Sequence, residues 1–279
     1  MKIFYLFVLL SFSLLSPIYS QSITAMTYNI RYDNPNDGED RWDARKVFLI
    51  NQIKFHAPDI LGIQEGLAHQ VDYLNNGLKD HKYVGVGRDD GKKKGEFSAL
   101  FFNTKIFKVI ESSTFWLSPT PDKISVGWDA AMERICTYAL FENKKTGQRL
   151  WVFNTHFDHR GKVARENSAR LIYERVQALN KDQYPCVVMG DLNLEPESEA
   201  IQYLSQHLQD TRMVSKDVVF GPEGTSNGFQ FDKPVTRRID YIFTSKSGVT
   251  VNKYAVLSDS KNLRYPSDHL PVYAELIIQ

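Results

Sequence analysis

Short apolar stretches that end in polar residues recur along the chain, and they predict β-strands. Each stretch is rich in β-branched and aromatic residues and is bounded by residues typical of turns. We expect strands at 23–30, 60–63, 83–87, 98–102, 108–116, 134–142, 150–154, 186–189, 239–243 and 272–278. A hairpin-like turn is expected at 143–147.

A second pattern places apolar residues three or four positions apart, as on one face of a helix. Val47, Ile50 and Ile53 follow this spacing, and Pro58 lies just beyond them, where the helix must have ended. By the same reasoning we expect helices over 42–55, 68–78, 163–178 and 198–204.

The order of these elements predicts the architecture. Helices and strands occur near both ends of the chain, with a run of strands between them. This order favours two similar halves, with β-sheets packed face to face and helices outside. Because the sequence contains no repeat, low-complexity block or long flexible linker, we expect one domain.

The first twenty residues predict a signal peptide. Lys2 is their only charged residue, an apolar run follows over 3–15, and the exit segment 16–20 begins and ends with the small residue serine. The run is too short for a membrane span. We therefore expect cleavage after Ser20, a domain at 21–279, no stable membrane insertion, and a periplasmic or secreted protein. A buried first helix or a retained anchor is the alternative.

Charge and cysteine content narrow the function further. The chain has 34 basic and 33 acidic residues, so loss of Lys2 leaves 33 of each. A net charge near zero disfavours nonspecific attraction to nucleic acid or anionic lipid. Cys136 and Cys186 both lie in apolar runs, which favours buried free thiols over a disulfide or a catalytic role.

Polar residues with catalytic or metal-binding chemistry follow several predicted strands. Glu65 comes after an apolar strand, Asn29 ends the first one, and Asp268 and His269 precede the last one. Strand ends are where layered α/β proteins assemble active sites. This mix of carboxylates, amides and histidines suits a hard divalent cation and a phosphate ester. Individually, each residue could also be an ordinary turn or water-facing group.

Two further pairs have a spacing of two, which places both side chains on one face of an extended chain. Asp191 could accept a proton while Asn193 donates a hydrogen bond, so together they could hold an attacking water. His156 could donate to a phosphate oxygen, and Asp158 can face the same way. Asp240, on a later strand, is suited to orient a histidine. A tight turn and a core histidine are the alternatives.

Taken together and in order, six blocks resemble the endonuclease/exonuclease/phosphatase superfamily. The blocks are Asn29, Gln64-Glu65, Asn154-Thr155-His156, Gly190-Asp191-Leu192-Asn193, Arg238-Ile239-Asp240-Tyr241 and Ser267-Asp268-His269-Leu270-Pro271-Val272. The resemblance covers residues 23–278 and is strongest to exported bacterial members of undefined substrate. It implies an α/β (α+β) four-layer sandwich and hydrolysis assisted by Mg²⁺ or Mn²⁺.

The resemblance also implies roles for these residues. Glu65 would bind the main metal ion, with Asn29 and Asp268 nearby. Asp191 and Asn193 would orient the attacking water.

On the same basis, His156 would stabilise charge on the phosphate. His269, held by Asp240, would act as base or phosphate ligand, so the role of base stays shared with Asp191. Arg31 stands where some endonucleases carry an aspartate near the metal, which adds a possible phosphate ligand.

Residues outside these blocks bear on the substrate. Trp116, Trp128 and Arg134 could form an aromatic wall for a base or sugar. The basic loop 87–96 could grip a second phosphate, or it could be a solvated hairpin tip.

We therefore expect a monomeric, exported, metal-dependent hydrolase of phosphate esters. A phosphodiesterase or nuclease and a phosphatase for phospholipids, inositol phosphates or sugar phosphates both remain open. A catalytically silent binding module on the same fold is the alternative from another class.

Overall fold

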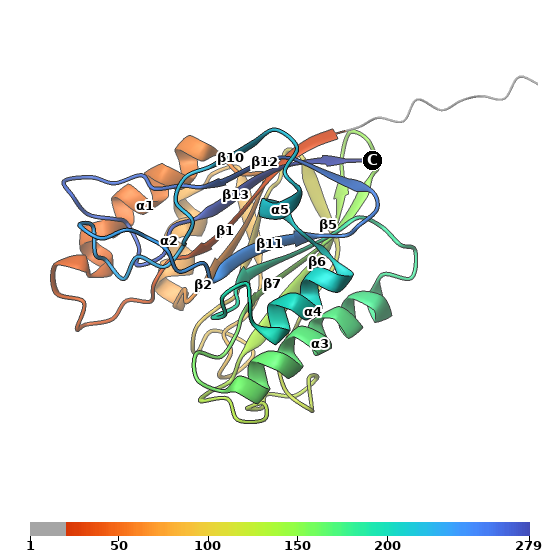
Figure 1. Ribbon diagram of the computed structural model, residues 1–279, viewed down its shortest axis with the longest axis horizontal. Coiled ribbons are helices and arrows are strands. Elements are labelled where there is room, and N and C mark those ends of the chain that lie inside the picture. The colour runs from red at the N-terminus through yellow and green to blue at the C-terminus, as the bar shows by residue number, and fades with distance from the viewer. Residues whose placement is uncertain (1–20) are drawn as a thin grey trace, which may run out of the picture.

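A computed structural model describes residues 21–279, and it contains two β-sheets packed face to face (Figure 1). The expected signal peptide, residues 1–20, lies outside the described residues. Among the described helices, none is long and apolar enough to cross a membrane.

The first sheet has seven strands, and β1 lies at its centre. β1 pairs antiparallel with β13 and parallel with β2. In order across the sheet the strands are β10 (Val218–Phe220), β12 (Val249–Val256), β13 (Val272–Ile278), β1 (Gln21–Asn29), β2 (Ile60–Gln64), β4 (Leu100–Asn103) and β3 (His81–Val84).

The second sheet has six strands, and β7 and β8 run parallel at its centre. Its order is β5 (Phe107–Trp116), β6 (Ile135–Asn143), β7 (Arg149–His156), β8 (Cys186–Asp191), β11 (Asp240–Thr244) and β9 (Gln209–Asp210).

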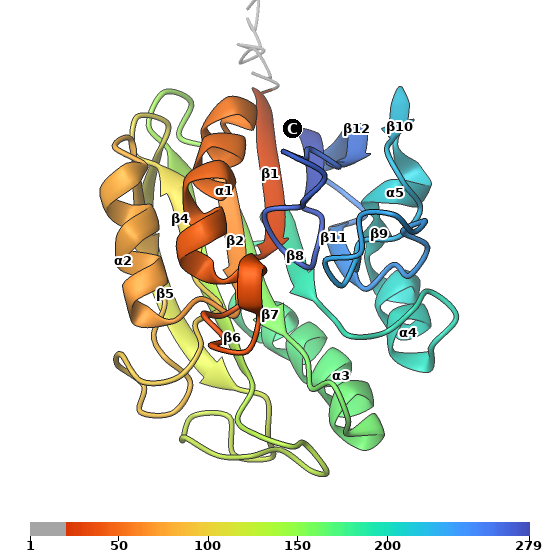
Figure 2. The same ribbon diagram turned by 90° about the vertical axis from the view of Figure 1, so that its left-hand side faces the viewer.

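Helices cover the outer faces of both sheets. α1 (Trp42–His56) and α2 (Ala68–Gly77) pack on the first sheet, and α3 (Lys162–Leu179) and α4 (Glu199–His207) pack on the second. Figures 1 and 2 show the two helix pairs on opposite sides of the sheets. A short α5 (Thr211–Val214) and the 3-10 helix η1 (Gly38–Asp40) complete the helices of the described chain. The predicted four-layer sandwich is confirmed.

The period-two alternation of the strands explains the layers. In β8, Val187 and Met189 face the other sheet, whereas Cys186 and Val188 face α3 and α4. A strand buried on both faces reads as a continuous apolar run, as the sequence shows here. Both cysteines are buried and free, as expected.

The same alternation decides where the polar strand ends point. Asp191 lies two positions after Met189 and four after Val187, so its side chain is on the same face of β8 and points between the sheets. His156 in β7 and Asn29 in β1 likewise share the parity of residues that face between the sheets. One end of the sandwich therefore collects polar groups from both sheets.

A buried amide joins the sheets just behind this end. Asn154 of β7 donates from Nδ2 to the backbone oxygens of Ile63 and Ala99, at 2.9 Å each. Its Oδ1 accepts from Nε2 of Gln64 at 2.7 Å. A Cβ on Gly62 would lie 2.7 Å from that oxygen, so only glycine fits there. These bonds fix the offset between the two sheets, which apolar packing alone leaves adjustable.

The structure differs from the predicted elements in a few places. β12 was not predicted, because a bulge between Val251 and Lys253 interrupts its alternation. The strand expected at 83–87 is His81–Val84, since Gly85 turns the chain with φ 132°. The short β9 and β10 carry too few residues to show a period.

Candidate active site

A pocket of about 570 Å³ opens where polar ends of strands from both sheets meet. Its lining residues are Arg31, Tyr32, Glu65, Arg88, Glu96, Met132, Arg134, His156, His159, Asp191, Asn193, Asp268 and His269. It thus brings together eight of the twelve residues singled out by sequence, and two more, Asn29 and Asp240, form hydrogen bonds to them from behind.

Asn29 lies behind the pocket and links two carboxylates from different sheets. Its Nδ2 lies 3.0 Å from Oε1 of Glu65 and 2.9 Å from Oδ2 of Asp191. Its amide oxygen accepts from the backbone N–H of Arg31 instead. Asn29 therefore orients the two carboxylates with its nitrogen, rather than offering its oxygen to a metal.

Three residues of the site have a left-handed backbone that side chains rarely adopt. They are Glu65 with φ 63°, Arg31 with φ 55° and Asn193 with φ 50°. Each such residue costs of order 1–3 kcal/mol, a cost that typically occurs at functional sites. Glu65 is the first residue after β2, and its Oε2 accepts a hydrogen bond from the backbone N–H of Tyr32 at 3.1 Å.

His269 is held by a buried aspartate, as expected from the sequence. Its Nδ1 lies 2.8 Å from Oδ2 of Asp240, which also accepts from Oγ1 of Thr225 at 2.5 Å. Asp240 is buried at the start of β11, and the bond fixes the ring so that Nε2 faces the pocket. That Nε2 lies 3.8 Å from Oδ2 of Asp191.

The charges of these buried groups depend on one another. Burial and the charge of Asp240 together raise the pKa of Asp191 to about 7, against the lowering effect of His269. Burial alone would lower the pKa of His269, but the carboxylates of Asp240 and Asp191 outweigh it and hold that pKa well above its usual value. At neutral pH, His269 is therefore a cation beside a carboxylate that can take up a proton.

His156 has the opposite electrostatics. Burial lowers its pKa well below the usual value, and the positive charges of Arg134 and Arg88 add to this. The ring is therefore neutral. Its Nε2 lies 3.1 Å from Nδ2 of Asn193, which donates, so the ring proton lies on Nδ1. His156 can thus offer a neutral N–H donor rather than a cation.

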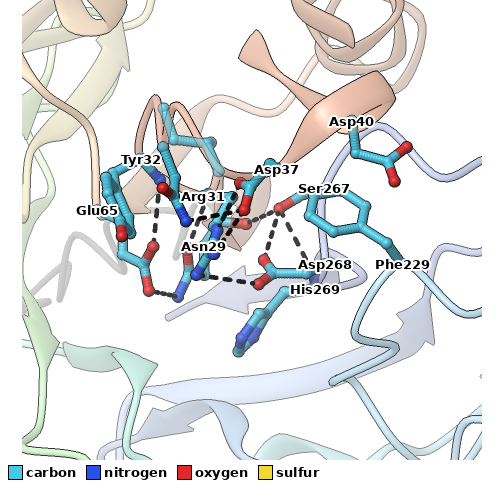
Figure 3. Close-up of polar contacts among 12 residues, drawn as sticks. Asn29, Arg31, Tyr32, Asp37, Asp40, Glu65, Phe229, Ser267, Asp268 and His269 are labelled. Carbon is cyan, nitrogen blue, oxygen red and sulfur yellow. Dashed lines mark hydrogen bonds and ion pairs between the residues drawn. The ribbon is translucent and has the colours of Figure 1, made fainter.

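Asp268 enters the site from the loop before β13. Its Oδ2 lies 3.6 Å from Nη1 of Arg31, and Oγ of the preceding Ser267 donates to the backbone oxygen of Asn29 at 2.7 Å (Figure 3). Behind them, the buried Arg45 of α1 donates to the backbone oxygens of Ile30 and Pro266. Arg45 therefore ties the loop after β1 to the loop that carries Asp268.

The carboxylates around this space fit a hard divalent cation. Oxygen atoms of Glu65 and Asp191 and a ring nitrogen of His156 all lie within 4.8 Å of one another. Burial raises the pKa of Asp268, and the negative charge of Glu65 contributes to that rise. Converging carboxylates that repel one another are stabilised by a bound cation, and Mg²⁺ and Mn²⁺ prefer such oxygen ligands.

The residues expected to bind substrate divide into two groups. Arg31 and Arg134 line the pocket, but Asp158 and Trp128 do not. Asp158 is buried, and its two oxygens accept from the backbone N–H groups of Ala131, Arg160 and Gly161. It cannot reach a substrate because it holds the loops together.

The aromatic wall expected from the tryptophans is also missing from the lining. Trp116 is buried at the end of β5, where its Nε1 donates to the backbone oxygen of Arg88 at 2.8 Å. Trp116 therefore supports the loop 87–96 instead of contacting a substrate. Trp128 lies in the loop before β6, outside the lining residues.

Sequence reasoning missed several residues of the pocket and its support. The signal for Arg88 and Glu96 was available, because both belong to the basic loop 87–96. No comparable signal marks Met132 or Tyr32, and the role of Arg45 depends on carbonyl groups far away in sequence. His159 follows the block that contains His156 and could have been found there.

Carboxylates, histidines and amides gathered at one end of a sandwich are the groups that metal-assisted hydrolysis of a phosphate ester requires. This chain belongs to the Endonuclease/Exonuclease/phosphatase family, whose sequence pattern matches residues 26–269.

Solved structures support the assignment in detail. A protein of this family from Bacteroides thetaiotaomicron is 37% identical, with a TM-score of 0.90, covering 94% of this chain and 99% of that one. A mannosyl-6-phosphatase from the same organism is 38% identical, with a TM-score of 0.87, covering 91% and 99%.

Curated relatives are more distant. Human Nocturnin is 24% identical over 91% of this chain and 64% of its own length. The 3'-5'-exoribonuclease subunit Ccr4 of Mycosarcoma maydis is 22% identical over 93% of this chain and 51% of its own length. The chain thus spans between about half and two thirds of the length of these relatives.

Proposed function

We propose that this protein is an exported, Mg²⁺- or Mn²⁺-dependent phosphatase that hydrolyses phosphate monoesters of small polar alcohols. The likeness that carries the proposal is to the mannosyl-6-phosphatase, which is 38% identical and matches over 99% of its own chain. The nuclease relatives are more distant in sequence, at 22–24% identity. The complete set of acidic, amide and histidine groups argues against a catalytically silent binding module.

Within this proposal the residues have the following tasks. Glu65 and Asp268 would hold the divalent cation, with Asp191 beside them and Asn29 fixing the orientation of Glu65 and Asp191. The cation, when bound, would supply Lewis-acid stabilisation of the charge that develops on the phosphate.

Asp191 and Asn193 would position the attacking water. The pKa of Asp191, raised to about 7, suits it to take a proton from that water at neutral pH. His156 and the cationic His269 would donate hydrogen bonds to phosphate oxygens, stabilising the transition state more than the ground state. Arg31 would contact the phosphate from the loop after β1.

The test is hydrolysis by the purified protein, expressed from its full-length sequence, with Mg²⁺, Mn²⁺ or EDTA. The panel contains mannose 6-phosphate, p-nitrophenyl phosphate, bis(p-nitrophenyl) phosphate, RNA and single-stranded DNA. We expect EDTA-sensitive release of inorganic phosphate from the monoesters, with kcat/KM at least about 100-fold above that for the diester. Preference for the diester or for nucleic acid would refute the phosphatase assignment.

Export and oligomeric state are part of the same proposal. We expect residues 1–20 to be removed, so N-terminal sequencing of the secreted protein should begin near Gln21. Since one chain supplies every residue of the pocket described above, a monomer suffices for activity, which size-exclusion chromatography checks.

A further inference from the structure

One side of the pocket has a composition that hydrolysis does not require. This side wall consists of Arg88, Glu96, Arg134 and His159. These residues come from the loop after β3, the segment before β6 and the segment after β7. It adjoins the catalytic groups, since Oε2 of Glu96 lies 3.8 Å from Nδ1 of His156.

Arg134 is the central residue of the side wall and has an unused donor. The residue is only 4% exposed, and among the described residues its Nη1 has no hydrogen-bond partner. Its Nε lies 3.5 Å from Oδ2 of Asp158, whose oxygens are already taken by backbone N–H groups. A buried donor without a partner costs about 1–3 kcal/mol, so a ligand that accepts from it would recover this cost.

His159 adds a second donor at the rim. Its Nδ1 lies 3.0 Å from Nη2 of Arg134, which can only donate. The ring nitrogen Nδ1 is therefore an acceptor, and in the neutral ring the proton lies on Nε2. Burial lowers the pKa of His159, and the nearby charge of Arg134 lowers it further. The lowered pKa favours the neutral ring.

Glu96 supplies an acceptor, and it is held rigidly. Arg88 binds it through two nitrogen–oxygen contacts of 2.7 and 3.0 Å. The backbone N–H of Arg88 donates to the backbone oxygen of Glu96, and Trp116 supports the loop from below. Each carboxylate oxygen of Glu96 keeps lone-pair capacity for a donor from a ligand.

The charges and shapes of the side wall select the kind of ligand. In the side wall Glu96 balances Arg88, and the buried carboxylate of Asp158, which lies behind the wall, balances Arg134, so little net charge remains to attract an anion. A second phosphate would have to lie beside Glu96. A nucleobase would need an aromatic face, but Arg31 lies over the ring of Tyr32 at 4.8 Å. Hydroxyl groups both donate and accept, and they match this mixture.

We propose that Arg134, His159 and the Arg88–Glu96 pair form the subsite that binds the hydroxyl groups of a sugar in a sugar phosphate. The proposal rests on the proposed function, because it places the sugar beside a phosphate held at the catalytic groups. It assigns specificity to residues that take no part in the proton transfers.

Three variants test the subsite, each with mannose 6-phosphate and with p-nitrophenyl phosphate, which has no sugar hydroxyls. They are Arg134→Lys, which keeps the buried charge, His159→Leu at an exposed position, and Glu96→Gln. We expect kcat/KM for mannose 6-phosphate to fall at least tenfold more than for p-nitrophenyl phosphate, mainly through KM. A fall of equal size for both substrates in all three variants would overturn the proposal.

Inhibition by free mannose gives an independent readout. We expect mannose to inhibit p-nitrophenyl phosphate hydrolysis competitively in the wild type and at least tenfold more weakly in His159→Leu. Equal inhibition of both proteins would contradict the subsite. Arg149→Gln is the matched control, since Arg149 lies at the opposite end of β7, about 20 Å from His156.

The two proposals fail in different ways. If the wild type cleaves only the diester or nucleic acid, the proposed phosphatase function fails, and the subsite fails with it. If the wild type cleaves both monoesters and the variants do not discriminate between them, only the sugar subsite fails.

Discussion

The buried bond between Asp240 and His269 allows a sharp test of the site. Asp240→Asn keeps the size of the side chain but removes the negative charge that His269 and Thr225 both contact. Asp240 is buried, so water cannot replace the lost charge. Two linked effects are expected, one on the rate and one on its dependence on pH.

The rate should fall because a charge-assisted hydrogen bond is lost. Such a bond contributes about 1.5–3 kcal/mol, which corresponds to a fall in kcat of about 10- to 150-fold. The pH dependence should shift through Asp191. The pKa of Asp191 is raised to about 7 by burial and, next in size, by the charge of Asp240. Without this charge the pKa of Asp191 falls, so the deprotonated base persists to lower pH.

The assay is the pH profile of kcat for p-nitrophenyl phosphate at saturating Mg²⁺, between about pH 5 and 9. The acidic limb of Asp240→Asn should move to lower pH while the maximum falls. A variant with at least one third of wild-type kcat and an unmoved limb would refute the reasoning. Asp182→Asn, at an exposed loop position, is the control and should match the wild type.

Three further predictions concern the metal, the cysteines and the packing of the strands. Glu65→Gln should lower kcat about 100-fold and raise the Mg²⁺ concentration needed for half-maximal activity, as measured by adding Mg²⁺ to EDTA-treated protein. An unchanged titration curve would count against Glu65 as a ligand. The thiols of Cys136 and Cys186 are buried and their pKa values are raised, so neither should react with Ellman's reagent until guanidinium unfolds the protein. Fewer than two reactive thiols per unfolded chain would reveal a disulfide. Gly190→Ala should destabilise the fold by about 1–3 kcal/mol or more, since the new Cβ would lie 1.9 Å from a backbone oxygen of β7. Gly147→Ala has open space around it and should cost only the backbone strain of about 1 kcal/mol. Equal urea midpoints for the two variants would contradict this account.

Much of the fold and part of the site could be predicted from sequence because one rule governs both. Successive side chains of a strand point to opposite faces of the sheet, so the apolar residues two and four positions earlier predict the direction of a polar residue at the strand's end. Asp191 and His156 are examples, since their parity with buried neighbours directs them between the sheets. Asp240 was predicted to orient a histidine, and the structure places it on His269.

The remaining features depend on contacts between residues that are distant in sequence. Trp116 donates a hydrogen bond to the backbone at Arg88, 28 positions away, and no local sequence pattern predicts this contact. Asp158 has the right spacing to face a substrate, yet the loop after β7 turns backbone N–H groups onto it. Trp128 was expected at the substrate because of its residue type, but only the path of its loop decides where it lies.

The buried amide of Asn154 has a consequence for how the enzyme becomes active during folding. Each sheet carries only part of the proposed catalytic groups: Glu65, Asp268 and His269 follow or precede strands of one sheet, and His156 and Asp191 belong to the other. A chain with both sheets formed but not yet docked would have its secondary structure and no catalytic centre. The return of activity during refolding therefore reports the docking of the two sheets, and the three hydrogen bonds of Asn154 form in that same step.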